Sequence, residues 1–350
     1  MEKYSKITIK DVAKKAGISK GTVDRVIHNR GEVSEKSKEK VMKAIEELGY
    51  EPNIFASMLA SNKEHLVACL MPQFHEGDYW AMSNEGVTRG IEMAKPFNVK
   101  VIPFFYNQYD IESFKASCEE VIKNDPSGVV LAPMFKNETR NFVEKLAENR
   151  IPYVYIDSKI EEDDYFAYFG MPMYQSGYLC ADLLTLGKNP GKAAVVRIVR
   201  DKNRQSDPTV NRREGFMDYM SEHFPDCEVQ NVFIYPNDTE GIESTLEKFF
   251  SEHPDFKHIV MFNSRVYLIT NYLEKHPDPD RRVLGYDSLK RNLNALRTGT
   301  VQALITQHAD MQSFYAIQAL TDYIVLKKTP AKKDNYMHMD LLTRFNIDYY

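Results

Sequence analysis

Apolar residues recur at helical spacing in three segments within the first fifty residues. The inward-facing positions are Ile9, Val12, Ala13 and Ala16, then Thr22, Val23 and Val26, then Val41, Ala44, Ile45 and Leu48. The segments begin at the capping residues Thr8, Ser19 and Ser34, and the first and third end at Gly17 and Gly49. Residues 1–50 are therefore predicted to form a small all-α head of three helices.

From Leu66 onward, short apolar runs alternate with amphipathic stretches. The predicted strands are 66–72, 99–105, 128–133, 152–157, 192–199, 229–235, 258–263, 282–287 and 301–307. Helical patterns lie between them, for example at 114–123, 139–149 and 244–252. Such alternation predicts an α/β body in which helices cover both faces of parallel sheets.

The charge is unevenly distributed along the 350 residues. Residues 1–45 hold 12 Lys and Arg against 6 Asp and Glu, and the remainder holds 33 against 44, so that a net charge of −5 hides a basic head. A basic head on an acidic body indicates that the head, and not the body, binds a polyanion. We expect no signal peptide, membrane anchor or disulfide framework, and we expect the cytoplasm as the location, because no long apolar run occurs and the four cysteines are widely spaced.

The stretch from Gly17 to Gly21 fits two incompatible patterns. G-x-S-x-G is the nucleophile elbow of serine hydrolases, which needs a strand before the serine and a helix after it. A capped helix precedes Ser19 here, and fewer than twenty residues leave no room for a hydrolase sheet. Ser19 is therefore predicted to be a helix cap, and the segment is predicted to be a helix-turn-helix.

The outward face of the second helix carries polar residues suited to base edges in the major groove. They are Lys20, Gly21, Asp24, Arg25 and His28. An arginine can bind O6 and N7 of one guanine together, whereas the plainer interpretation is a solvated polar face.

The segment ITIKDVAKKAGISKGTVDRVIHNRGEVSEKSKEKVMKAIEELGYEPN resembles the DNA-binding headpiece of the LacI (lactose-repressor) family of bacterial transcription regulators. The matching letters are T-I-x-D-V-A-x-x-A-G-I-S-x-x-T-V-x-R-V, then V-S, then L-G-Y-x-P-N. The resemblance implies that Lys20 and Gly21 take variable base-reading positions and that Arg25 takes the common one. It also implies phosphate contacts from Thr8, Ser19 and Thr22.

Asp24 departs from the serine that is usual in this family. A carboxylate there would repel phosphate, but it could pair with Lys20 or His28 one turn away, or accept from a cytosine amino group. Both alternatives leave the operator sequence open.

Residues 51–65 resemble the family's hinge, which becomes helical on the operator. Leu59 occupies the position of a leucine that wedges into the minor groove and bends the DNA. The alternative is an ordinary linker with Leu59 packed on the body.

The rest of the chain resembles the family's periplasmic-binding-protein-like effector domain of type I. The matching motifs are N-E-G-V-x-x-G-I at 84–91, S-G at 176–177, R-x-x-G-F at 212–216, G-Y-D at 285–287 and I-T-Q at 305–307. The resemblance implies two doubly wound parallel-sheet lobes, with the chain crossing between them near Ala167, Gln307 and Ala331. The expected N-terminal lobe is 66–166 with 308–330, and the expected C-terminal lobe is 167–307 with 331–350.

In open α/β sheets, ligands bind beyond the carboxyl ends of the strands. The residues that this rule and the resemblance assign to effector binding are Asp78, Tyr79, Trp80, Phe135, Asp157, Arg212, Asn263, Arg265, Asp287 and Gln307, with Met134 and Asn203 nearby. The aromatic pair Tyr79-Trp80 lies where relatives stack rings on sugars. The effector is therefore expected to be a sugar or a sugar derivative. Phe135, Met171 and Ser264 stand where sugar-binding relatives often have acidic or amide groups, which argues against a simple unmodified hexose or pentose.

Other chemistry finds little support in the sequence. No dinucleotide fingerprint, P-loop or nucleophile–base pair occurs, and the acidic run at 161–164 is interpreted as a solvated loop, so we expect no enzyme, cofactor or metal. The leading hypothesis is a homodimeric repressor on a near-palindromic operator, controlled by a small-molecule effector. A sugar-binding transport or sensor protein of the periplasmic type is the alternative.

Overall fold

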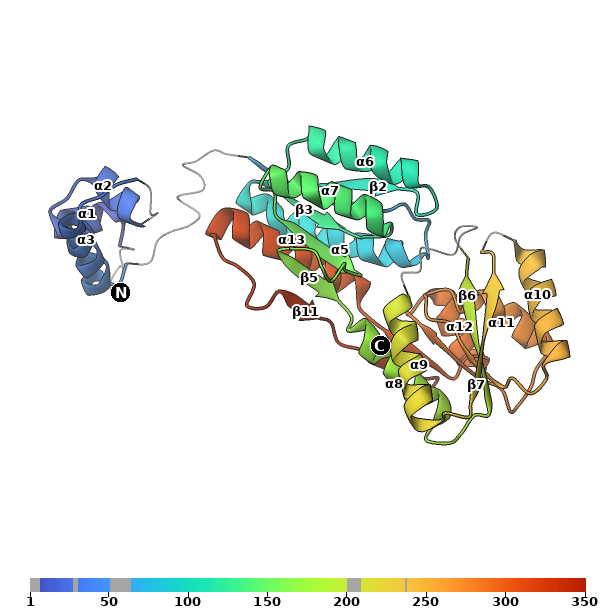
Figure 1. Cartoon of the computed structure of the whole chain (residues 1–350). Coiled ribbons are helices and arrows are strands. Elements are labelled where there is room, and N and C mark those ends of the chain that lie inside the picture. The colour runs from blue at the N-terminus through green and yellow to red at the C-terminus, as the bar shows by residue number, and fades with distance from the viewer. Residues whose placement is uncertain (1–6, 28–30, 51–63, 200–208, 237) are drawn as a thin grey trace. The chain divides into compact units, whose positions relative to one another are not determined.

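A computed structural model describes residues 7–27, 31–50, 64–199, 209–236 and 238–350. The chain divides into two compact units, a head of residues Met1–Lys63 and a body of residues Glu64–Tyr350 (Figure 1). None of the helices in these ranges is both long and apolar enough to cross a membrane.

The head is formed by three helices around a small apolar core. They are α1 (Ile9–Ala16), α2 (Lys20–Ile27) and α3 (Glu35–Leu48). Val12, Val23 and Val41, one from each helix, are fully buried. Gly17 and Gly49 end α1 and α3 with a positive φ, the backbone conformation that favours glycine. The predicted three-helix head is confirmed.

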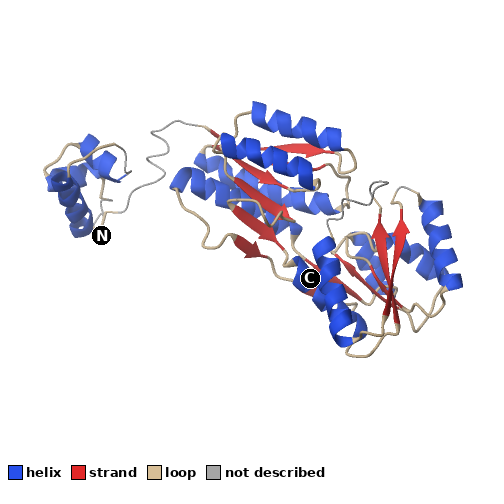
Figure 2. Cartoon of the chain, viewed as in Figure 1, coloured by secondary structure: helices blue, strands red, loops and turns tan. Residues whose placement is uncertain are grey.

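The first lobe of the body is a parallel sheet with helices on both faces (Figure 2). Its strands, in sheet order, are β11 (Asp334–Tyr336), β5 (Ala167–Gly170), β4 (Tyr153–Asp157), β3 (Gly128–Leu131), β1 (His65–Pro72) and β2 (Val99–Tyr106). Its helices are α5 (Tyr79–Ala94), η1 (Lys95–Phe97), α6 (Ile111–Lys123), α7 (Lys136–Glu148) and α13 (Ala309–Leu326). The helices α5 and α13 cover one face, and α6 and α7 cover the other (Figure 1).

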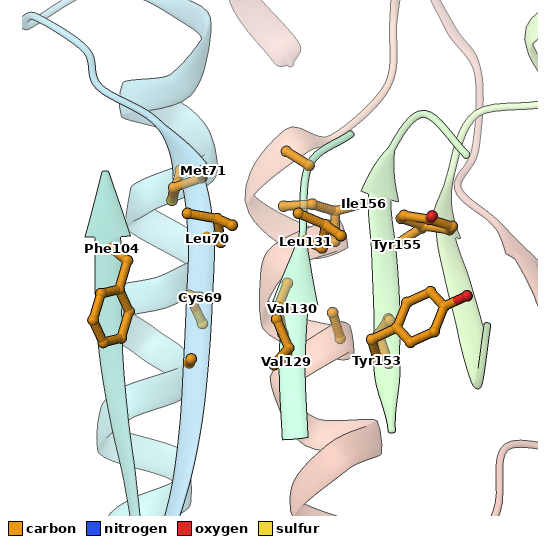
Figure 3. Close-up of a cluster of buried hydrophobic side chains, with 14 of the residues drawn as sticks. Cys69, Leu70, Met71, Phe104, Val129, Val130, Leu131, Tyr153, Tyr155 and Ile156 are labelled. Carbon is orange, nitrogen blue, oxygen red and sulfur yellow. The ribbon is translucent and has the colours of Figure 1, made fainter. Parts of the chain in front are cut away.

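The core of the first lobe is built on its central strands, β1, β3 and β4 (Figure 3). Leu70, Val130 and Val154 are almost fully buried in neighbouring strands. Strands buried on both faces are typical of parallel sheets, which explains why their sequences are continuous apolar runs.

The second lobe repeats this plan with one antiparallel edge. Its strands, in sheet order, are β12 (Asp340–Leu342), β10 (Ala303–Thr306), β9 (Arg282–Tyr286), β8 (His258–Val260), β6 (Lys192–Ile198) and β7 (Glu228–Ile234), and β12 runs antiparallel to β10. Its helices are α8 (Met173–Thr185), α9 (Val210–His223), α10 (Thr239–Glu252), α11 (Tyr267–Lys275), α12 (Lys290–Thr298) and η2 (Ile347–Tyr349).

Alternate residues of β6 face opposite layers of helices. Ala193 and Val195 belong to a core with α8 and α9, whereas Ala194 and Val196 belong to a core with α10, α11 and α12. The period of two along a strand therefore divides the second lobe into two cores, one on each face of the sheet.

The chain crosses between the lobes three times, and two crossings lie later than expected. Residues 167–170 form β5 and residues 334–336 form β11, and both strands pair within the first sheet. The first crossing therefore follows Gly170 and the third follows Tyr336, which corrects the expected boundaries at 166/167 and 330/331. The second crossing lies at Gln307 and His308, between β10 and α13. Residues 334–336, Asp-Asn-Tyr, contain no apolar run that would have predicted a strand.

Two glycines let α8 and α9 cross at very short range. A Cβ on Gly177 of α8 would collide with the carbonyl oxygen of Arg212 in α9, and a Cβ on Gly215 would collide with the carbonyl oxygen of Tyr174. This crossing fixes the position of α9, and with it the position of the Arg212 side chain.

We expect Gly177→Ala to lower the free energy of unfolding of the body by about 1–3 kcal/mol, because backbone atoms of α9 must move. Thermal and urea unfolding would measure the change. The control is Gln175→Ala, since Gln175 is exposed on the same helix. Wild-type stability in Gly177→Ala would show that the two helices are not this close.

Candidate functional site

The second helix of the head presents a short polar face. Lys20, Gly21 and Arg25 are exposed, whereas Thr22 and Asp24 are half-buried. Val23 is fully buried on the opposite side and anchors α2 to the head core. Because a recognition helix uses its N-terminal residues at base edges, Lys20, Gly21 and Arg25 lie on the surface that such contacts need.

Two hydroxyl residues of the head are engaged in helix caps. The Ser19 Oγ accepts from the Thr22 N–H at 3.2 Å and lies 2.9 Å from the Thr22 Oγ1, so Ser19 caps α2. The Thr8 N–H and hydroxyl both donate to the Asp11 carboxylate, at 2.8 and 2.7 Å, and these bonds lower the pKa of Asp11. The predicted capping box is confirmed, and the Thr8 hydroxyl must turn away from Asp11 before it can donate to a phosphate.

Three candidates fall outside the residues that the structure describes. They are His28, Leu59 and Asn203. Their predicted roles in DNA contact, DNA bending and ligand binding remain predictions.

A cleft between the two lobes contains nine of the ten predicted effector-binding residues. They are Asp78, Tyr79, Trp80, Asp157, Arg212, Asn263, Arg265, Asp287 and Gln307, joined by Met134 and Ser264. They come from the carboxyl ends of strands in both sheets and from the first turns of α5 and α9. The rule that ligands bind beyond strand ends therefore places these residues in one cleft.

The first lobe supplies aromatic rings and a carboxylate. The Tyr79 hydroxyl donates to Asp157 Oδ1 at 2.7 Å, and burial raises the pKa of Tyr79 well above its usual value. The Trp80 ring packs edge-on against the Tyr79 ring, with 5.1 Å between the ring centroids. Trp80 is 6% exposed; it lines the cleft and is also part of the core of the first lobe. This wall offers both an apolar ring surface and a hydrogen-bond acceptor.

The second lobe supplies a buried guanidinium. Arg212 donates to the carbonyl oxygen of Phe262 at 2.7 Å and to Gln307 Oε1 at 3.2 Å, and it stacks on the Tyr286 ring at 4.3 Å. Its Nε is buried with no hydrogen-bond partner among the described residues. A buried donor without a partner costs free energy, so this atom is suited to a ligand oxygen.

Asp287 is a buried carboxyl group beside that arginine. It is 3% exposed, and the Gln307 Nε2 donates to its Oδ2 at 3.5 Å. Burial raises the pKa of Asp287 to about 7; Arg212 opposes this rise and Asp157 adds to it. The cleft therefore holds a carboxyl group that can change its charge near neutral pH.

A buried amide links the two walls of the cleft. Gln312 of α13 accepts from the Asp157 N–H at 3.0 Å and donates to the carbonyl oxygen of Gln307 at 2.9 Å. It therefore positions two cleft residues, although it does not line the cleft itself. Sequence reasoning missed Gln312 because its partner Asp157 is 155 positions away.

The lobes also touch at the mouth of the cleft. Arg265, after β8 in the second lobe, donates through Nη1 to the Tyr109 hydroxyl, after β2 in the first lobe, at 2.8 Å. The cleft is thus closed over the buried polar groups, and a direct hydrogen bond spans its mouth.

Phe135 does not line the cleft, which corrects its assignment to effector binding. Its ring packs against Tyr106 and Phe114 in the core of the first lobe, and it is 8% exposed. The cleft-lining residues that the sequence did not indicate are Gln108, Tyr109, Met173, Ile198, Thr209 and Leu289. Gln108 and Tyr109 follow the second strand, so the strand-end rule would have found them.

The acidic run at 161–164 is used in ion pairs. Glu161 pairs with Lys159 at 2.9 Å and Glu162 with Arg140 at 2.8 Å. Asp164, fully exposed, lies 3.6 Å from Lys333. These carboxylates have protein partners, which agrees with the interpretation of the run as a solvated loop.

Comparison with known proteins adds the evolutionary context of both units. Residues 8–53 match the family model "Bacterial regulatory proteins, lacI family", and residues 67–328 match the model "Periplasmic binding protein domain". The crystal structure of a protein described as a LacI transcriptional regulator from Bacteroides fragilis is 38% identical, with a TM-score of 0.77 over 82% of this chain and 100% of that chain. The regulator MalR of Streptococcus pneumoniae is 26% identical over 82% of this chain and 85% of its own length. The ribose operon repressor of Lactococcus lactis is 24% identical over 81% of each chain.

A DNA-binding helix-turn-helix head joined to a two-lobed, ligand-binding body defines a bacterial transcription regulator. The chain belongs to the lacI family of bacterial regulatory proteins.

We expect Tyr109→Phe to make the cleft open more often, because it removes the hydrogen bond to Arg265. A net hydrogen bond of about 0.5–1.5 kcal/mol corresponds to a change of about two- to tenfold in the ratio of closed to open forms. Acrylamide quenching of Trp80, the one tryptophan, would measure the change. The control is Tyr174→Phe, which removes an exposed hydroxyl that donates to Asp218. Equal quenching in both variants would mean that the Tyr109–Arg265 bond does not hold the cleft closed.

Proposed function

We propose that this protein represses transcription in the cytoplasm by binding, as a homodimer, to a near-palindromic operator, and that a carbohydrate in the cleft controls its operator affinity. The observation that carries the proposal is the joining of a lacI head, with Lys20, Gly21 and Arg25 exposed on α2, to a closed cleft lined by aromatic and charged side chains. Two-fold symmetry follows from the dimer, because two identical recognition helices need two equivalent half-sites.

The carbohydrate assignment is supported by the chemistry of the cleft and by the relatives. Trp80 and Tyr79 offer ring faces to the C–H face of a sugar, while Asp157, Asp287 and Arg212 offer hydrogen bonds to hydroxyl groups. The ribose operon repressor of Lactococcus lactis is named for a sugar operon.

The two other function classes have weaker support. A sugar-binding transport or sensor protein would not need the lacI match at residues 8–53. In our proposal the chain acts by binding and not by catalysis, because the relatives are transcription regulators.

The contacts to DNA are assigned as follows. Base edges are contacted by Lys20, Gly21 and Arg25. Phosphates are contacted by Thr8, Ser19 and Thr22. The DNA-facing charge of α2 also depends on the carboxylate of Asp24 and the imidazole of His28. We assign Leu59 to the minor groove as a wedge that bends the operator. One of the Ser19 and Thr22 hydroxyls uses its proton in the hydrogen bond between them, so the other can donate to a phosphate while that bond is kept.

The test of the DNA-binding half is selection of an operator from a random duplex library, followed by footprinting. We expect two half-sites about one helical turn apart. Arg25→Ala should cost about 1–3 kcal/mol and relax specificity at one base position in each half-site. The control is Lys43→Ala, an equal loss of charge on α3. An asymmetric footprint with one chain per site contradicts the homodimer, and an unchanged base preference in Arg25→Ala contradicts the base contact.

The test of the ligand-binding half is a thermal-shift screen of sugars and sugar derivatives. A ligand at one hundred times its dissociation constant stabilises the body by about 2.7 kcal/mol. We expect the effector to change Trp80 emission saturably, with a midpoint that tracks its effect on operator affinity, because coupling between two binding equilibria is reciprocal.

In Trp80→Phe we expect weaker effector binding and, since Trp80 is also part of the core, a lower melting temperature. The matched control is Phe135→Leu, which disturbs the same core outside the cleft and should lower only the melting temperature. Trp80 does not belong to the site if the effector alters operator affinity but leaves Trp80 emission unchanged and binds Trp80→Phe as tightly as the wild type.

A further inference from the structure

Asp157 and Asp287 occupy equivalent places in the two lobes. Asp157 ends β4 of the first sheet and Asp287 follows β9 of the second, and their φ angles are +65° and +66°. Few residues other than glycine adopt this backbone conformation, although aspartate tolerates it better than most. The Asp157 N–H donates to Gln312 Oε1 at 3.0 Å, and the Asp287 N–H donates to the carbonyl oxygen of Ile305 at 2.9 Å. These bonds hold both carboxyl groups in the cleft, one from each lobe.

Asp287 is the more deeply buried aspartate of this pair, and its side-chain hydrogen bond is longer than the bond that Asp157 accepts from Tyr79. Its carboxyl group is 3% exposed, and Gln307 donates to it over a long distance of 3.5 Å. The charged and titratable groups that face Asp287 or share its cleft are Arg212 of α9, Asp157 of β4, Tyr79 and Asp78 at the start of α5, and Arg265 after β8. Arg212 is the nearest compensating charge, but it already donates to Phe262 and Gln307. The Arg212 guanidinium therefore directs its hydrogen bonds to a carbonyl oxygen and an amide oxygen of the second lobe.

We propose that Asp157 and Asp287 form a carboxylate pair that favours an open cleft unless Asp287 is protonated or a ligand donates hydrogen bonds to it, so that acidification and ligand binding drive closure in the same direction. The proposal rests on the proposed function, because it concerns regulation of the same cleft.

The physical reason is the change in surroundings when the cleft closes. In an open cleft water solvates both carboxylates, whereas the closed and empty cleft places two like charges in a poorly solvated space. A proton on Asp287 removes one of these charges. A hydroxyl or ammonium group of a ligand stabilises the charge by donating to it, and an anionic group at the same point would add to the repulsion.

The direction of the pH dependence follows from which state binds more protons. Burial raises the pKa of Asp287 to about 7 in the closed form, so the closed form takes up a proton as the pH falls through 7. Closure of the empty cleft is therefore favoured below pH 7 and disfavoured above it. By the same linkage, the contribution of Asp287 to the stability of the closed form declines as the pH rises from 3.8, the ordinary pKa of an aspartate, toward 7.

The experiment uses the full chain without ligand or DNA and measures acrylamide quenching of Trp80 on both sides of pH 7. Trp80 lines the same cleft, so opening increases its access to the quencher. In the wild type we expect quenching to rise in one step whose midpoint lies between 3.8 and about 7, the ordinary pKa of Asp287 and its pKa in the closed form. Asp287→Asn, which resembles the protonated acid, should quench weakly with no step.

A second variant keeps the test decisive if Asp287→Asn does not fold. Asp157→Asn removes the opposing charge from the other lobe, so the step should move to lower pH and become smaller. The control is Asp348→Asn, which changes an exposed aspartate that pairs with Arg297, and it should behave as the wild type does.

Two results overturn the proposal: a wild type without a step between pH 3.8 and about 7, or a step that stays unchanged in Asp287→Asn and Asp157→Asn. A failure to select an operator or to find an effector would count against the proposed function alone, because this measurement uses neither.

Discussion

The burial of the Arg212 guanidinium is the constraint on which the rest of the cleft depends. A charge removed from water must be compensated by hydrogen bonds and by opposite charge. The compensation comes from the backbone of Phe262, the amide of Gln307 and the carboxyl group of Asp287. These groups follow three neighbouring strands of the second sheet, and the close crossing of α8 and α9 brings the arginine to them. The position of the Arg212 side chain thus depends on three strand ends, on the close crossing of α8 and α9, and on Gln307, where the chain crosses between the lobes.

The two lobes build their walls of the cleft from the same two structural features. In each, a glycine of the helix beside the cleft lies against the backbone of a second helix: Gly86 of α5 meets Asp310 of α13, and Gly177 of α8 meets Arg212 of α9. In each, an aspartate at the end of a central strand adopts a positive φ. The first lobe adds aromatic rings at the start of α5, and the second adds the guanidinium, so that the walls differ in chemistry although they share a construction.

The sequence predicted those parts of the fold that show a helical period or a continuous apolar run, and it indicated those cleft residues that follow strand ends. All nine strands expected from apolar runs are present, whereas β5, β11 and β12 were missed. β11 and β12 contain no long apolar run, and residues 167–170 were expected to form a crossing between the lobes. The strand-end rule found Asp157 and Asp287 but also indicated Phe135, because it cannot say which side of a loop a side chain takes. Gln312 and the Tyr109–Arg265 bond depend on contacts between distant segments, which no local pattern contains.

The chain's return to the first sheet has a consequence for folding during synthesis. The helix α13 and the strand β11 come from residues 309–336, yet both complete the first lobe, and Ile317 and Leu320 are fully buried in its core. A ribosome that has made β1 to β5 has therefore not made the helix that covers β3 and β4. Strands β6 to β10 of the second lobe are synthesised before that helix emerges, and only β12 and η2 of that lobe follow it. At about 5–20 residues per second this gap lasts several seconds. During that time the head can fold, while an apolar face of the first sheet lacks its covering helix and stays accessible to chaperones.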